Sequence, residues 1–104
     1  MQSRRKHCSS MAEVRAEIDA LDRAIVALLA DRLHYIDEAA RLKQSRDQVR
    51  DEARIADVLQ KTEAEALRLG ASSRVIASAY RALIEASIEH ELERFDSVKA
   101  SARR

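Results

Sequence analysis

The apolar residues near the start of the chain recur with the spacing of a long helix. Spacings of four, three, four and three residues separate Val14, Ile18, Leu21, Ile25 and Leu28. This is the seam of a helix that packs against another helix, and its phase continues through Leu42. We therefore predict one helix over residues 12–44, about 45 Å long at about 1.5 Å per residue. The chain offers no equal partner for it, so we expect a second copy to cover the seam in a homodimer.

The rest of the chain is predicted to be helical too. Proline is absent and Gly70 is the only glycine, so the turns of a sheet of short strands are missing. Asp51 can cap a second helix that ends near Gly70. Ser72 or Ser73 can cap a third, whose apolar stripe reaches Phe95. A chain of 104 residues has room for one modest core, so we predict an all-α domain of three helices, long, short and long.

The two ends of the chain and its charges set the domain limits and exclude several functions. Residues 1–10 are polar and lack periodicity, so we predict a disordered leader, then a helical domain over residues 11–97 and a basic tail over 98–104. Nineteen Lys and Arg intersperse with eighteen Asp and Glu, which does not fit a nucleic-acid-binding face. The single Cys8 favours a reducing compartment, the cytoplasm, and no apolar stretch is long enough for a membrane span.

Two cations occupy positions where the seam would take leucine. Arg32 continues the phase of Leu28, and Lys43 follows 11 residues later, within ~20° of the same face and ~16 Å along the axis. A buried cation needs a partner anion, because desolvation is costly. The sequence reserves no evident carboxylate for either residue. For Arg32, the alternative is a long side chain that extends from the dimer edge into solvent.

Arg15 lies too far from Arg32 to share a small ligand with it in one chain. The two are 17 residues apart, about 25 Å along the helix and roughly 100° around it. In an antiparallel dimer of the long helices, Arg15 of one chain would lie beside Lys43 of the other. The alternative for Arg15 is an ordinary surface residue of the first helical turn.

On the third helix, two polar residues interrupt the apolar stripe. Ser87 and Glu91 are four residues apart and share one face. Ser87 alone fits a small residue at a close helix crossing, and Glu91 fits either an ion pair with a seam arginine or a carboxyl kept protonated by desolvation. The three histidines form no HxxxH pair, so we expect no metal site, and the chain has neither a glycine-rich phosphate loop nor a nucleophile elbow.

These polar positions, taken together, resemble one known family. The runs ValArgAlaGluIleAspAlaLeuAsp at 14–22, LeuLeuAlaAspArg at 28–32 and ValArgAspGluAlaArg at 49–54, with Lys43 between the last two, resemble the all-α chorismate mutases. The resemblance covers nearly all of the predicted domain. It implies an intertwined helical homodimer with two shared active sites, acting on a small dicarboxylate without a cofactor or a metal.

The resemblance also implies a role for each matching residue. Arg15 of the partner chain and Arg32 would hold the two carboxylates of the substrate, and Lys43 would face its ether oxygen. The remaining positions implied to line the site are Asp51, Arg54, Ile55, Ser87 and Glu91. Of the whole set, the resemblance implies catalytic roles for Lys43, Glu91 and Arg32. A Claisen rearrangement suits such a site, since it requires an oriented substrate and cations facing the developing charge.

Ile55 departs from the pattern of many chorismate mutases, which have a glutamate directly after the second-helix arginine. This departure, with a slightly shorter loop after Lys43, is similar to the isochorismate-pyruvate lyase branch of the fold. The resemblance to the family as a whole implies rearrangement of chorismate to prephenate in aromatic amino-acid biosynthesis. The alternatives are cleavage of isochorismate to salicylate and pyruvate, a mutase for an amino-substituted chorismate, and a non-catalytic helical dimer.

Overall fold

The computed structural model describes residues 5–103, and their regular structure is entirely helical. The elements are α1 (Met11–Leu42), a short 3-10 helix η1 (Arg46–Gln48), α2 (Glu52–Arg68) and α3 (Ser73–Ala102). The predicted order of long, short and long α-helices is confirmed. None of the helices in this described range is long and apolar enough to cross a membrane.

Helix α1 begins where the predicted leader ends. The Ser10 hydroxyl accepts a hydrogen bond from the Glu13 amide at 3.2 Å, and the Glu13 carboxylate accepts one from the Ser9 amide at 3.2 Å. This reciprocal capping satisfies amide groups that a helix start leaves unpaired. Residues 5–10 contain no helix, while the part of the leader at residues 1–4 lies outside the described residues.

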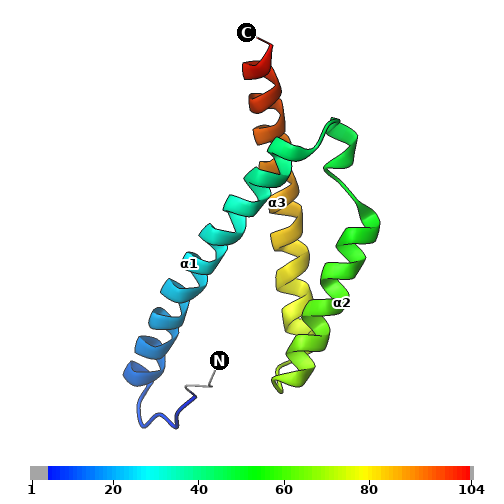
Figure 1. Cartoon of the computed structure of the whole chain (residues 1–104). Helices are drawn as coiled ribbons and strands as arrows, with labels where there is room; N and C mark the ends of the chain where they lie inside the picture. Colours follow the sequence, from blue (N-terminus) through cyan, green and yellow to red (C-terminus); the bar gives the residue numbers. More distant parts are fainter. Residues whose placement is uncertain (1–4, 104) are drawn as a thin grey trace. The chain divides into compact units, whose positions relative to one another are not determined.

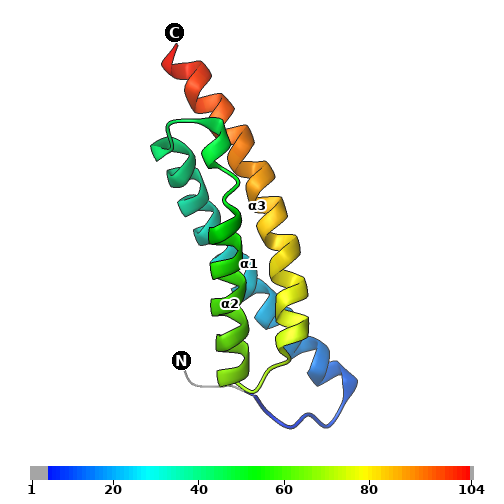
Figure 2. The same ribbon diagram turned by 90° about the vertical axis from the view of Figure 1, so that its right-hand side faces the viewer.

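Local interactions set the start of α2, the start of α3 and the turn between these helices. The Asp51 carboxylate accepts from the Arg54 amide at 3.1 Å, and the Ser72 hydroxyl accepts from the Val75 amide at 3.2 Å. Between the helices, Gly70 has a φ of +72°, the left-handed conformation that glycine adopts without strain. The turn lays α2 and α3 side by side and antiparallel (Figures 1 and 2). Helix α3 continues to Ala102, past the boundary predicted at residue 97.

The chain divides into two compact units, Met1–Arg32 and Leu33–Arg104. In the described part of the first unit, α1 exposes the seam predicted from the sequence. The exposed fractions are 49%, 59%, 50% and 62% for Ile18, Leu21, Ile25 and Leu28. One chain therefore leaves about half or more of each of these apolar side chains in water.

The second unit has a small core where the end of α1 meets α3. Ala40 is fully buried, and Val49 and Phe95 are 4% and 6% exposed. Ile88 and Leu92 of α3 pack against this cluster. Burying a phenylalanine side chain contributes about 1.5–3 kcal/mol, so Phe95 is a main anchor of this junction. Ala40 and Val49, which precede and follow Lys43 in the sequence, therefore both belong to this core.

Candidate active site

Lys43 is the central cation of the second unit. It follows the last residue of α1, and its amide still donates to the Ala39 carbonyl at 3.0 Å, so the backbone keeps a helical bond there. The ammonium lies 2.6 Å from a Glu91 carboxylate oxygen and 3.5 Å from the Val49 carbonyl oxygen. Hydrogen bonds between two charged groups are short and strong, and this pair joins α1 to α3.

The two partners differ in exposure. The Glu91 side chain is 6% exposed, whereas that of Lys43 is 29% exposed. The sequence reserved no evident carboxylate for Lys43, and the structure supplies Glu91. The ion pair considered for Glu91 was with a seam arginine, and its partner in the structure is Lys43 instead. The buried carboxylate anchors the cation and leaves part of it accessible to a ligand.

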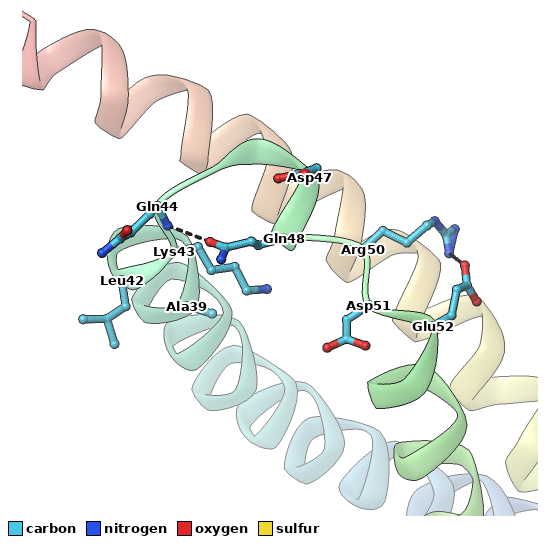
Figure 3. A pocket seen from close by; sticks show the side chains of 9 residues that line it. All are labelled: Ala39, Leu42, Lys43, Gln44, Asp47, Gln48, Arg50, Asp51 and Glu52. Carbon is cyan, nitrogen blue, oxygen red and sulfur yellow. Dashed lines mark hydrogen bonds and ion pairs between the residues drawn. The ribbon is translucent and has the colours of Figure 1, made fainter.

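The segment after Lys43 is folded back by one glutamine. The side-chain oxygen of Gln48 accepts from the amides of Gln44 at 2.9 Å and Ser45 at 3.2 Å. These amides follow the end of α1, where the backbone must otherwise find water. Figure 3 shows the Gln48 side chain turned back toward Gln44. The turn therefore has a defined shape beside Lys43.

Two exposed ion pairs tie this segment to α3 on either side of Glu91. Arg46 donates to Asp96 at 3.0 Å, and Arg50 donates to Glu85 at 2.5 Å. Exposed pairs of this kind contribute up to about 1 kcal/mol each. They restrict how the segment lies on the helix, and so help to hold Lys43 over Glu91.

An open pocket of about 800 Å³ lies beside this segment. Its size falls in the range of about 300–1,000 Å³ that small-molecule sites occupy. Figure 3 shows Lys43 and Asp51 extending into the space between the end of α1 and the start of α2, whereas Arg50 turns away. The lining residues are Ala39, Leu42, Lys43, Gln44, Asp47, Gln48, Arg50, Asp51 and Glu52.

The second helix carries three of the predicted site residues. Asp51 caps the helix through the Arg54 amide, and Ile55 is half-buried on the next turn. The Arg54 guanidinium donates to Asp57 at 2.6 Å, and Lys61 donates to the same carboxylate at 3.1 Å. Hydrogen bonds from Lys61 and then Arg54 hold the pKa of Asp57 below its ordinary value of 3.8. To bind a substrate, Arg54 must exchange Asp57 for it.

Ser87 lies one turn before Glu91 on α3. It is 5% exposed, and its hydroxyl donates to the Leu83 carbonyl at 2.7 Å. This bond satisfies the buried hydroxyl within its own helix. The small side chain fits the alternative of a close helix contact, and the structure places Ser87 and Glu91 on adjacent turns, as predicted.

Arg15 and Arg32 belong to the first unit. Arg15 is exposed and Arg32 is half-buried, both on α1. Their separation of 17 residues on one continuous helix corresponds to about 25 Å, as the sequence required. The roles that the resemblance implies for them stay predictions.

A polar cluster that we did not predict lies beside the site. Asp37 of α1 lies 2.7 Å from the His90 ring and 3.4 Å from the Arg94 guanidinium, both on α3. His90 directly precedes Glu91, and Asp37 and Lys43 are three residues to either side of Ala40. These spacings in the sequence could have predicted that the cluster lies next to Lys43 and Glu91. Among the residues that the structure describes, no three His, Cys, Asp or Glu side chains group as metal ligands would.

The arrangement favours electrostatic catalysis. An anchored, partly accessible ammonium beside a pocket can stabilise negative charge that develops on a ligand oxygen. A family model described as chorismate mutase type II matches residues 14–92, roughly three quarters of the chain and the whole of the Lys43 and Glu91 site. No curated protein sequence matches the chain. The family match supports chorismate mutase-type activity, an isomerisation of a small molecule. The chain belongs to the chorismate mutase type II family.

Proposed function

We propose that this protein is a chorismate mutase, which rearranges chorismate to prephenate in aromatic amino-acid biosynthesis. The observation that carries the proposal is the Lys43 ammonium, held 2.6 Å from the buried Glu91 carboxylate at the edge of an open pocket, within the range of the family match. We propose a cytoplasmic location because the sequence has a single cysteine, the free Cys8, which fits a reducing compartment.

In the proposed reaction, Lys43 stabilises the ether oxygen as its carbon–oxygen bond breaks. An ammonium has three hydrogens, and among the described residues Glu91 and Val49 accept two of them. The third is then available for the substrate oxygen. Because the rearrangement is intramolecular, catalysis requires a compact substrate conformation and fixed charges, with no nucleophile.

The proposed substrate-binding arginines are Arg32 and Arg15, the latter from the partner chain of a homodimer. Two observations support the dimer: the exposed apolar seam of α1, and the length of helix that separates Arg15 from Arg32. Arginine suits the substrate carboxylates, because its planar fork donates two parallel hydrogen bonds. Arg54, released from Asp57, and Ser87 complete the proposed polar contacts.

Subunit mixing tests the shared site. An Arg15→Ala chain and an Arg32→Ala chain are each expected to be nearly inactive as homodimers. After exchange, each heterodimer should contain one intact site, so part of the activity should return. A mixture that remains as inactive as its parents, with exchange confirmed by differently tagged chains, would contradict a shared site.

The substrate is identified by incubating the purified protein separately with chorismate, with isochorismate and with an amino-substituted chorismate. Prephenate from chorismate supports the proposal. Salicylate and pyruvate from isochorismate alone support the lyase, which Ile55 favours because its apolar side chain cannot bond the ring hydroxyl of chorismate. Rearrangement only of an amino-substituted chorismate identifies the third alternative, and no reaction with any of them favours a non-catalytic helical dimer.

A further inference from the structure

A half-buried polar cluster fastens the last turns of α1 to α3. The Asp37 carboxylate lies 2.7 Å from the His90 ring nitrogen Nε2 and 3.4 Å from Arg94 Nε. The side chains of His90 and Asp37 are 36% and 35% exposed. These contacts between partly buried groups restrict how the two helices lie against each other.

Along the chain, Ala40 lies midway between this cluster and the catalytic lysine. Asp37, Ala40 and Lys43 are spaced by three residues, about 4.5 Å of rise each. Ala40 is fully buried in one cluster with Phe95, so side chains pack α1 on α3 there. With Asp37 held before this contact and Lys43 held after it, a change at one end of the segment is transmitted to the other.

We propose that His90 is a positioning residue for Lys43. Its hydrogen bond with Asp37 fixes the direction in which α1 leaves the Ala40 contact, and this direction determines where the Lys43 ammonium lies relative to Glu91. Since Glu91 is the next residue after His90, one turn of α3 positions both members of the ion pair. The expected effect of His90 on kcat rests on the proposed function. Its expected effect on the structure around Lys43 rests only on the contact between α1 and α3.

The kinetic test compares His90→Ala with His90→Gln. Alanine removes the bond to Asp37, whereas the amide nitrogen of glutamine can occupy a place similar to that of Nε2. We expect His90→Ala to lower kcat about tenfold with little change in KM, because Lys43 acts in the transition state. His90→Gln should recover most of the rate. In a Lys43→Ala background, His90→Ala should have no further effect, since the residue it positions is gone.

A structural test proceeds without any substrate. Hydrogen exchange of the backbone amides at residues 40–43 should be about tenfold faster in His90→Ala than in the wild type, and near normal in His90→Gln. Arg94, which lies 3.4 Å from Asp37, is expected to keep the helices paired in the alanine variant. The matched control is His34→Ala, whose ring lies against Tyr35 on the same helix and should leave both measurements unchanged.

Two results would overturn the inference. One is a His90→Ala variant with normal kcat and normal exchange at residues 40–43. The other is an equal loss of rate in the Lys43→Ala background, which would mean that His90 acts independently of Lys43. If the wild type converts none of the candidate substrates, the proposed function fails, and the exchange experiment still decides the role of His90.

Discussion

Replacing Lys43 with alanine separates the two consequences of the ion pair with Glu91. The carboxylate is 6% exposed and would lose a cation at 2.6 Å. Leaving one member of a buried pair alone costs about 3–5 kcal/mol. Because Lys43 itself is 29% exposed, the pair is partly screened by water, and we expect a smaller loss of about 2–3 kcal/mol of unfolding free energy. For a chain of this size, this lowers Tm by about 10–15 °C.

The same substitution is expected to lower kcat at least ~100-fold, the effect of removing one donor to a developing oxyanion. Adding Glu91→Gln to Lys43→Ala distinguishes the two effects. The neutral amide removes the unpaired buried charge, so the double variant should regain most of the stability and none of the rate. Denaturant unfolding measures the stability, and the loss of chorismate absorbance measures the rate.

Either of two results would refute this reasoning. A Lys43→Ala variant with near-normal turnover would remove Lys43 from the mechanism. A double variant no more stable than Lys43→Ala would mean that the lone Glu91 carboxylate is not the source of the lost stability. Unfolding is measured at one protein concentration throughout, because Tm of the proposed homodimer would depend on it.

Three further predictions concern Ile55, Asp57 and Glu91. Ile55→Glu should raise kcat/KM for chorismate relative to isochorismate, and an unchanged ratio of products would exclude a role for Ile55 in selection. Hydrogen bonds from Lys61 and Arg54 lower the pKa of Asp57. The stabilising contribution of Asp57 is therefore present above pH 3.8 and is lost as the pH falls through the lowered pKa. Lys61→Met should raise the titration midpoint of Asp57 in an NMR experiment, and an unmoved midpoint would contradict this cause. Glu91→Gln should keep more of the rate than Glu91→Ala, because its amide oxygen can still accept a hydrogen bond from the Lys43 ammonium, which lies 2.6 Å from the carboxylate; equal losses in the two variants would contradict a positioning role for Glu91.

Much of the fold is local in origin and was therefore predictable. The start of α2 at Asp51 and of α3 at Ser72 depends on side chains that bond amides three residues away, and the turn at Gly70 depends on one residue's freedom to adopt a positive φ. The period of the seam similarly predicted the long α1. None of these features needs information from a distant part of the chain.

The candidate site was predicted in its members but not in its pairings. Lys43 and Glu91 were identified because each charge interrupts an apolar face, which is visible in the sequence. Their partnership joins residues 48 apart, and that of Asp37 with His90 joins residues 53 apart. Several carboxylates are available to any lysine in a chain with 18 Asp and Glu, so composition cannot select one.

By itself, then, the sequence determined the helices, their ends, the apolar seam and the positions of the interrupting charges, because short-range hydrogen bonds and helical periodicity act within a few residues. Only the tertiary structure decided that Glu91 is the partner of Lys43 and that His90 holds Asp37. The physical reason is that long charged side chains select partners by distance in space. That distance is set by the buried cluster that Ala40 of α1 forms with Phe95 of α3, which exists only once the helices have packed.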